Sequence, residues 1–340
     1  MLILGYTMKS ITILANLIFL LISSSAWSFQ LGINAHIWNL SDNDWNKSLK
    51  LVSAMNFKMI RLDVPWKIVE AKKGNYSVPD VWDKTIDYAV QNGIEPVLIL
   101  DYGNPFYENG NKPRNKESIA AFGQYAKFIV THYKNKVKYI QIWNEWDAGN
   151  SGTTPGTVDD YKNLVRSTYT IIKNANPDSI VITGAFSSAA FNKHLGIGAE
   201  NYFEDYVTPD MASYTDVIAI HPYTTYREKP YNNYWAYLSQ VQYSKHILNS
   251  TAGYKNKPLF ITEIGWSTSL TKDSISESMQ AEYLLRAICD AKKLGVSAVM
   301  LYDLRDDFPF LDRTASGFGF FKYNWGPKEA VEKLSQKLCD

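Results

Sequence analysis

The feature that most restricts how this chain can fold is a regular alternation of short apolar runs and amphipathic segments. The runs are rich in β-branched and aromatic residues, which suit buried strands. The segments between them place apolar residues at helical spacing, and Lys116–Tyr133 is the clearest example. Strands that alternate with helices in this way predict a parallel sheet covered by helices.

The alternation repeats often enough to close a barrel. Strands are predicted at Gln30–His36, Met59–Val64, Glu95–Leu100, within Tyr139–Asp147, at Ile180–Gly184, Val217–His221, within Leu259–Trp266 and at Val296–Tyr302. Helices are predicted at Asp42–Met55, Val81–Asn92, Lys116–Tyr133, Val158–Asn174, Trp235–Leu248, Ser276–Leu294 and Pro327–Leu338. This order predicts an α/β fold with one domain over residues 29–340, the (β/α)₈ TIM barrel. An open doubly wound sheet is the alternative, but the sequence has no G-x-G-x-x-G after a strand and no P-loop.

The first 28 residues have the features of a secretory signal peptide. Lys9 precedes the apolar run Ile11–Ile22, and small residues follow up to Ala26 and Ser28. A positive start, a short apolar run and a small-x-small site are typical of such signals. We therefore expect a mature chain that begins near Phe29 and is secreted or periplasmic. A retained membrane anchor is the alternative, although the run is short for a membrane span.

Composition restricts the possible partners. The formal net charge is +1 and Lys and Arg do not cluster, which argues against nucleic-acid binding. Aromatic residues make up 14% of the chain, with 23 Tyr and 10 Trp. They could fill the core or provide stacking surfaces for flat ligand faces. We expect a monomer that binds a carbohydrate and has no membrane contact beyond the signal peptide.

The two cysteines, Cys289 and Cys339, both lie on predicted helices late in the chain. Export permits a disulfide between them, and two buried thiols are the alternative. Without a histidine partner nearby they do not form a metal site. We expect no metal ion and no cofactor.

Polar residues follow the predicted strands. In a TIM barrel such residues meet at the C-terminal face, where active sites form. The long loops on that side are rich in Tyr, Trp, Asn and Gly, which suits a cleft for a hydroxylated ligand. The polar residues at the strand ends are Asn34, His36, Arg61, Asp63, Asp101, Tyr102, Asn104, Asn144, Glu145, His221, Tyr223, Glu263, Tyr302 and Asp303.

Two of these residues are glutamates that end apolar runs. Glu145 closes the run that begins at Tyr139, and Glu263 closes the run that begins at Leu259. A carboxylate at the end of a buried strand is costly to desolvate, so it needs a partner or a chemical task. A pair of carboxylates is what the cleavage of a glycosidic bond requires. The alternative for Glu145 is an ordinary loop acid.

Four short motifs at strand ends carry a family resemblance. They are W-N-E at 143–145, I-T-E-I-G-W at 261–266, R-L-D at 61–63 and H-P-Y at 221–223. In these motifs and in their order along the chain, the sequence resembles clan A of the glycoside hydrolases, most nearly family 39, with family 5 as a neighbour. The resemblance implies a retaining β-glycosidase in which Glu145 is the acid/base and Glu263 the nucleophile. The sequence differs from family 39 because it lacks an added β-sandwich, and Tyr302 stands where many clan members have Trp.

Several other residues are predicted to support the two glutamates or to bind sugar. Arg61 beside Glu263 would hold that carboxylate as an anion, and His221 or Tyr223 would orient it. Asn144 is placed to contact the sugar 2-hydroxyl. Further candidates for sugar contacts are His36, Tyr102, Asn104, Trp266 and Tyr302. The tryptophans that follow strands could stack on sugar rings or pack at the rim of the barrel; they are Trp38, Trp66, Trp146 and Trp266.

Three other functions remain possible on this fold. A barrel that binds polysaccharide without cleaving it would not need both glutamates. A metal-dependent hydrolase would need clustered ligands, and no H-x-H or H-E-x-x-H is present. A transglycosidase would share the mechanism.

The acidic loop with Asp303, Asp306, Asp307 and Asp312 could bind Ca²⁺ or form a solvated turn, but its spacing matches no calcium loop. The sugar, the linkage, and endo or exo action stay open.

Overall fold

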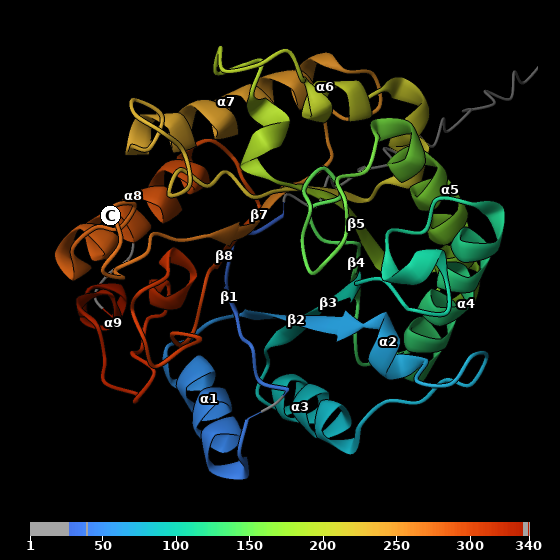
Figure 1. Cartoon of the computed structure of the whole chain (residues 1–340), viewed down its shortest axis with the longest axis horizontal. Coiled ribbons are helices and arrows are strands. Elements are labelled where there is room, and N and C mark those ends of the chain that lie inside the picture. The colour runs from blue at the N-terminus through green and yellow to red at the C-terminus, as the bar shows by residue number, and fades with distance from the viewer. Residues whose placement is uncertain (1–26, 39, 336–338, 340) are drawn as a thin grey trace, which may run out of the picture.

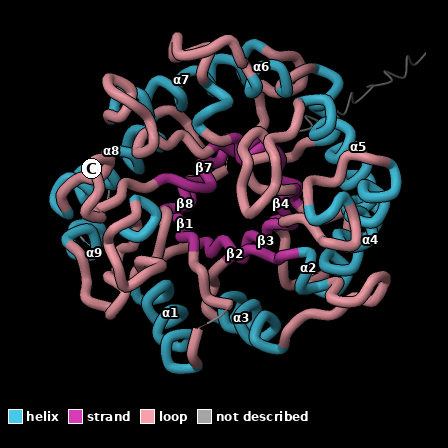
Figure 2. Tube along the Cα trace, viewed as in Figure 1, coloured by secondary structure: helices cyan, strands magenta, loops and turns pink. Residues whose placement is uncertain are grey.

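The computed structural model describes residues 27–38, 40–335 and 339, and it confirms the predicted single-domain (β/α)₈ barrel. Eight parallel strands pair in sequence order and β8 closes onto β1, as the ring of strands in Figure 2 shows. The strands are β1 (Gln30–Asn34), β2 (Met59–Pro65), β3 (Glu95–Asp101), β4 (Tyr139–Ile142), β5 (Ile180–Phe186), β6 (Val217–Ile220), β7 (Leu259–Ile264) and β8 (Ala298–Leu301). Apart from residues 27 and 28, the predicted signal peptide lies outside the described residues.

The helices surround the strands (Figure 1). They are α1 (Asp42–Ala54), α2 (Trp66–Val69), α3 (Asp80–Gln91), α4 (Lys116–His132), α5 (Val158–Ala175), α6 (Tyr202–Tyr206), α7 (Tyr234–Ser250), α8 (Glu277–Lys293) and α9 (Glu329–Ser335). The sequence did not predict α2 and α6, because helices of one turn are too short to show an apolar stripe. Among the helices of the described residues, none has the length and apolarity needed to cross a bilayer.

Several helices begin where a side chain caps the backbone. A side-chain oxygen of the residue before the helix accepts a hydrogen bond from a backbone N–H of the first turn, which otherwise has no partner. Because each cap fixes where its helix starts, it also fixes the length of the loop that precedes the helix. The capping residues are Ser41, Asn115, Thr157, Asn233 and Ser276.

The interior of the barrel changes character along its axis. An apolar cluster includes Met59, Phe260 and Met300, and all three are almost fully buried. Gly32 of β1 fits between these strands because a Cβ there would lie 2.9 Å from the Met59 Cβ. Strand side chains alternate between the two faces, so the residue two positions after Met59 points inward as well. That residue is Arg61, and it begins the polar layer under the C-terminal face.

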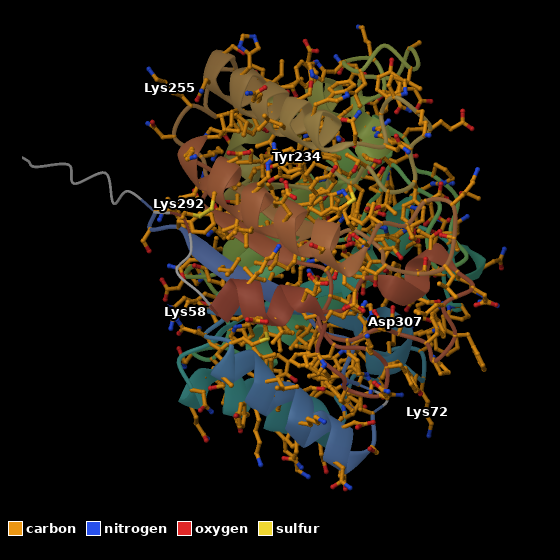
Figure 3. The ribbon with its side chains drawn as sticks, turned by 90° about the vertical axis from the view of Figure 1, so that its left-hand side faces the viewer. Lys58, Lys72, Tyr234, Lys255, Lys292 and Asp307 are labelled. Carbon is orange, nitrogen blue, oxygen red and sulfur yellow. A yellow bond between two sulfur atoms is a disulfide. The ribbon has the colours of Figure 1, made fainter. Side chains whose placement is uncertain are left out.

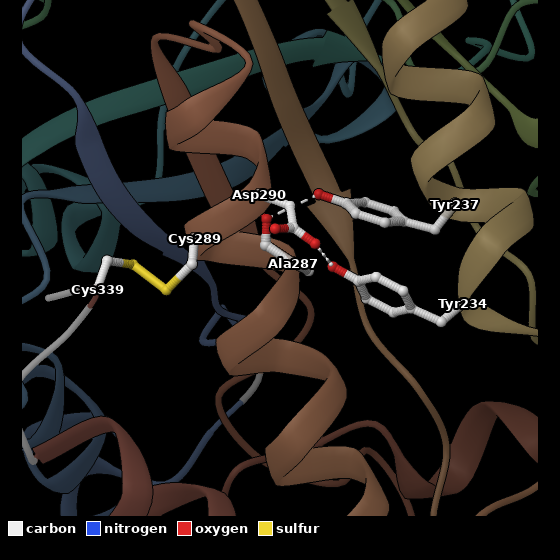
Figure 4. The surroundings of a disulfide bond; sticks show 6 residues. All are labelled: Tyr234, Tyr237, Ala287, Cys289, Asp290 and Cys339. Atoms are coloured by element: carbon white, nitrogen blue, oxygen red, sulfur yellow. Dashed lines mark hydrogen bonds between the residues drawn. A yellow bond between two sulfur atoms is a disulfide. The ribbon is translucent and has the colours of Figure 1, made fainter.

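A disulfide joins Cys289 of α8 to Cys339, so the structure favours the first of the two alternatives for these cysteines. Figure 4 shows the bond beside two contacts between α7 and α8. The Tyr234 hydroxyl donates to Asp290 at 2.8 Å, and the Tyr237 hydroxyl donates to the Ala287 carbonyl at 2.9 Å. The disulfide therefore ties the C-terminal end of the chain to a helix that is itself fixed to its neighbour.

We expect Cys339→Ser to lower the free energy of unfolding by about 4 kcal/mol, because the bond closes a loop of 50 residues in the unfolded chain. Urea unfolding of the variant and of the wild type would measure the loss. Wild type in reducing buffer should match the variant, and the variant should not respond to the reductant. Equal stabilities of the oxidised wild type and the variant would contradict the prediction.

Candidate active site

A cavity of about 630 Å³ opens at the C-terminal ends of the strands, where the sequence predicted the site. Figure 3 shows the two ends of the barrel, with Lys58, Lys255 and Lys292 at one end and Asp307 at the other. Polar and aromatic side chains from most of the strand ends meet in this cavity. The residues that line it are Asn34, His36, Arg61, Asp63, Tyr102, Asn144, Glu145, Asn150, Ser151, Ser187, Ser188, Tyr223, Tyr226, Glu263, Tyr302 and Phe318.

Glu145 and Glu263 face each other in this cavity. One carboxylate oxygen of each lies within 4.8 Å of the other. Their side chains keep 15% and 12% exposure, so both are reachable from the cavity although they are mostly buried. Retaining glycosidases hold two carboxyl groups about 5–5.5 Å apart, whereas inverting enzymes need room for a water between them. The separation fits the retaining arrangement.

The backbone after β4 turns sharply to present Glu145. Trp143 and Glu145 both adopt left-handed conformations, with φ of 66° and 47°. Such conformations are uncommon outside glycine, cost on the order of 1–3 kcal/mol each and persist only where the surroundings hold them. Here the rings of Trp143 and Trp146 are completely buried, and the Trp146 Nε1 donates to the Thr157 carbonyl at 3.0 Å. Packing of these indoles thus holds the turn that carries Glu145.

Arg61 forms the base of the site. Its guanidinium donates to Glu263 at 2.6 Å and to the side-chain oxygen of Asn34 at 2.7 Å. It also donates to Gln141 at 3.1 Å and to Asn144 at 2.8 Å. Arg61 is only 3% exposed, and the five donors of a guanidinium suit a buried network of this kind. One residue of β2 thereby fixes side chains from β1, β4 and β7.

The surroundings of Glu263 favour its ionised form. Burial opposes ionisation, but the nearby His221 and the paired Arg61 outweigh it, so the pKa of the Glu263 carboxyl lies below its ordinary value. The Tyr223 hydroxyl donates to the other carboxylate oxygen at 3.1 Å. Glu263 is therefore an oriented anion at neutral pH, as a nucleophile must be.

His221 connects the two glutamates. Its Nδ1 lies 2.9 Å from Glu145 and 3.7 Å from Glu263, and the ring is completely buried. The Nε2 lies 2.9 Å from the Thr262 hydroxyl, so both ring nitrogens have a hydrogen-bond partner. Of the two residues predicted to orient Glu263, Tyr223 donates to it, whereas the direct hydrogen bond of His221 is to Glu145.

Sequence reasoning missed two residues that hold the loop after β4: Asn150 in that loop, and Lys112 in the segment between β3 and α4. Asn150 donates to Glu145 at 2.5 Å. Lys112 is completely buried, and its ammonium donates to the Ala148 carbonyl, the Thr153 hydroxyl and the Thr154 carbonyl at 2.7–2.8 Å. Burial, with Arg114 nearby, lowers the pKa of Lys112 to about 8. No local pattern marks this lysine, because its partners lie 36 to 42 residues away in the sequence.

The structure brings most of the predicted site residues together but not all. His36, Arg61, Tyr102, Asn144, Tyr223 and Tyr302 line the cavity with both glutamates. Asn104 is buried outside it and donates to the Glu70 carbonyl at 3.0 Å. Trp266 is 2% exposed, and its Nε1 donates to Thr224 at 3.0 Å beneath α7 and α8. These two side chains are packed into the scaffold and do not reach the cavity.

Within the described part of the chain, two groups of side chains have the composition of a metal site, but each already holds positive charge. In the group of Glu145, His221 and Glu263, the Arg61 guanidinium occupies the Glu263 oxygen at 2.6 Å. In the second group, the Nδ1 of His36 lies 2.8 Å from Asp307 and 3.8 Å from Asp303. Desolvation opposes protonation there, but the Asp307 hydrogen bond and the nearby carboxylates raise the pKa of His36 to about 10. His36 is therefore protonated at neutral pH as long as no metal ion is bound.

We expect Arg61→Met to lower the free energy of unfolding at pH 7 by about 3–5 kcal/mol, because Glu263 would become an unpaired buried charge. The loss should shrink as the pH falls and Glu263 becomes protonated. The acidic limb of kcat/KM should move to higher pH, since without Arg61 the pKa of Glu263 rises. Urea unfolding and pH–rate profiles would measure both effects.

A matched control is Lys73→Met, which breaks the exposed Lys73–Glu117 pair and should change neither quantity. If Arg61→Met does not fold, Arg61→Lys keeps the charge but cannot form the four bonds, and it should shift the acidic limb in the same direction by a smaller amount. An unchanged acidic limb in a folded Arg61 variant would contradict the assignment.

Comparison with known proteins agrees with this geometry. The chain matches the model of the cellulase family, glycosyl hydrolase family 5, over residues 23–302. It is 30% identical over 109 residues to a 6-phospho-beta-glucosidase of Clostridium longisporum, a match covering 30% of this chain and 23% of that protein. The match thus spans less than a quarter of the length of the curated relatives.

Solved structures share the fold. A family 39 glycoside hydrolase from Bacteroides cellulosilyticus WH2 superposes with a TM-score of 0.74 at 23% identity, covering 92% of this chain and 64% of that one. A monomeric beta-xylosidase from Caulobacter crescentus CB15 has a TM-score of 0.69 at 18% identity, covering 90% of this chain and 67% of that one. The predicted resemblance to clan A of the glycoside hydrolases is confirmed. Family 5, which the sequence analysis gave as the neighbour of family 39, is the family whose model matches. The chain belongs to the cellulase family, glycosyl hydrolase family 5.

Proposed function

We propose that this protein is a secreted retaining β-glycosidase that hydrolyses a poly- or oligosaccharide by double displacement. The observation that carries the proposal is the pair Glu145 and Glu263, with carboxylate oxygens within 4.8 Å in an open cavity at the C-terminal face of the barrel. Membership of a glycosidase family supports it. The N-terminal sequence supports export, and we further propose that the protein acts as a monomer.

In the first step Glu145 donates its proton to the glycosidic oxygen while a Glu263 oxygen attacks the anomeric carbon. The bond to the leaving group breaks as the glycosyl–Glu263 ester forms. In the second step Glu145 removes a proton from water, the water oxygen attacks the same carbon, and the Glu263 carboxylate is released. Two inversions leave the product with the configuration of the substrate.

Other residues have supporting roles in this scheme. Arg61 and Tyr223 hold Glu263 ionised and oriented, and His221 orients Glu145. Asn144 is fixed by Arg61 through its oxygen, while its amide nitrogen lies 3.2 Å from the Tyr102 hydroxyl at the cavity wall. This position supports a contact between Asn144 and the 2-hydroxyl of the sugar, an interaction that strengthens in the transition state.

A screen of the purified protein on aryl β-glycosides and polysaccharides, with the product anomer followed by NMR, tests the proposal. We expect release of a β-anomer that mutarotates afterwards. An initial α-product would overturn the retaining assignment. Binding of polysaccharide without turnover would favour a non-catalytic barrel, and products longer than the substrate would favour a transglycosidase.

A further inference from the structure

The Glu145 carboxylate is held at both of its oxygens. Oε1 lies 2.9 Å from the Nδ1 of His221, and Oε2 accepts a hydrogen bond from the Nδ2 of Asn150 at 2.5 Å. Two such contacts fix the plane of the carboxylate as well as its position. A carboxylate has about four lone-pair sites, so sites remain on Glu145 for a proton and for the glycosidic oxygen.

Asn150 reaches Glu145 from a different part of the fold than His221 does. His221 directly follows β6 and is completely buried, whereas Asn150 lies in the loop between β4 and α5. Asn150 is partly buried and lines the cavity that contains both glutamates. It therefore contacts Glu145 at the surface where a substrate would bind.

The backbone of Asn150 is fixed by its own loop. Its carbonyl oxygen accepts hydrogen bonds from the Thr153 backbone N–H at 3.0 Å and from the Thr153 hydroxyl at 2.7 Å. The same hydroxyl accepts from the buried ammonium of Lys112 at 2.8 Å, and this ammonium also binds the carbonyls of Ala148 and Thr154. Because the loop is held on both sides of Asn150, the amide sets the direction of the carboxylate instead of following it.

The chemistry of the amide suits a carboxyl group that gives up a proton. The Nδ2 of asparagine only donates, so it matches the ionised form of Glu145 best. A hydrogen bond to an ionised acceptor is roughly twice as strong as one between neutral groups. The bond from Asn150 therefore strengthens while Glu145 loses its proton, and an interaction that strengthens as charge develops stabilises the transition state.

We propose that Asn150 is a positioning residue for both proton transfers of Glu145. It holds the carboxyl group in place while the proton passes from Glu145 to the glycosidic oxygen in the first step. It holds the resulting carboxylate in the same place while a proton passes from water to Glu145 in the second. The inference rests on the proposed function, because it takes the acid/base role of Glu145 from it.

Two variants of Asn150 test the inference. Asn150→Ala removes the amide, and Asn150→Asp keeps its shape but has no hydrogen to donate when it is ionised. In both we expect kcat/KM for a β-glycoside with a poor leaving group to fall about tenfold or more, because the proton donor is misplaced. For an aryl β-glycoside whose leaving group needs no proton, kcat/KM should stay within about twofold of the wild type.

The second step gives an independent measurement on the same variants. With the activated aryl β-glycoside, kcat and KM should fall together, because removal of a proton from water slows while formation of the ester does not. Azide attacks the ester without a general base, so it should restore this kcat. A merely structural role of Asn150 would give neither the parallel fall nor the recovery.

The matched control is Asn201→Ala, which also loses a hydrogen bond from an amide to a carboxylate, that of Glu204, outside the cavity. It should keep the wild-type values for both substrates. Equal losses for good and poor leaving groups in the Asn150 variants would overturn the positioning role, and so would wild-type rates in either of them. Both results leave the proposed function standing. If the wild type hydrolyses no β-glycoside or polysaccharide, the proposed function fails and the role of Asn150 fails with it.

Discussion

Glu263→Gln is expected to reduce kcat by about 10⁴-fold or more, the scale seen when an enzyme loses its nucleophile. The fold should persist, because the amide oxygen of glutamine can still accept the hydrogen bond from Arg61 and its NH2 can donate to the Tyr223 hydroxyl. Steady-state hydrolysis and circular dichroism would measure the two properties. The control is Glu282→Gln, an exposed glutamate of α8 whose loss should not change the rate. Near-normal hydrolysis by Glu263→Gln would contradict the assignment.

Glu263→Ala allows a sharper test of the same role. Azide can enter the space left by the carboxylate and attack the anomeric carbon directly. An activated aryl β-glycoside should then give an α-glycosyl azide, since only one inversion takes place. A β-glycosyl azide from this variant would mean that Glu263 is not the nucleophile.

Glu145→Ala should reduce kcat/KM by about 10²–10⁴-fold for substrates with poor leaving groups, the usual contribution of general acid catalysis. Substrates whose leaving group needs no proton should lose far less in this first step. The second step would also slow, because water loses its general base, so a burst of the released phenol should precede a slow steady state.

The anomeric configuration of the glycosyl azide distinguishes Glu145→Ala from Glu263→Ala. In Glu145→Ala the glycosyl–Glu263 ester still forms, so azide attacks the ester and gives a β-glycosyl azide. Equal losses for good and poor leaving groups, with no burst, would contradict an acid/base role for Glu145. The pair of variants thus assigns the two carboxylates independently.

Periodicity was sufficient to predict the scaffold. The strands and the long helices bury continuous apolar faces, and such faces leave a regular pattern in the sequence. The polar residues at the predicted strand ends also showed where the cavity would lie, since the C-terminal ends of parallel strands meet at one face of a barrel. The short helices α2 and α6 left no pattern and were missed. The signal peptide and its cleavage before Phe29 stay predictions.

Details of the site were less predictable because they depend on side-chain direction after the strands end. Trp266 and Trp38 both follow strands, yet Trp266 packs beneath helices and Trp38 lines a cavity of about 430 Å³ that shares His36, Asp63 and Tyr102 with the site. His221 bonds Glu145 instead of Glu263 because the β4 turn brings Glu145 to its Nδ1. Lys112 could not be found from the sequence, because only the folded loop assembles its acceptors.

The buried ammonium of Lys112 has a consequence for alkaline solutions. The ammonium donates one hydrogen to each of three oxygens. Above about pH 8 it becomes a neutral amine with two hydrogens, so one of the three hydrogen bonds to the loop beside Glu145 is lost. The contribution of Lys112 to stability should not fall with it: the folded pKa lies below the ordinary 10.5, so between these values the unfolded chain binds more protons at this residue, and this contribution rises with pH. A loss of turnover in mild base can therefore arise from a local change in the loop, to which the titration of Lys112 adds no loss of stability.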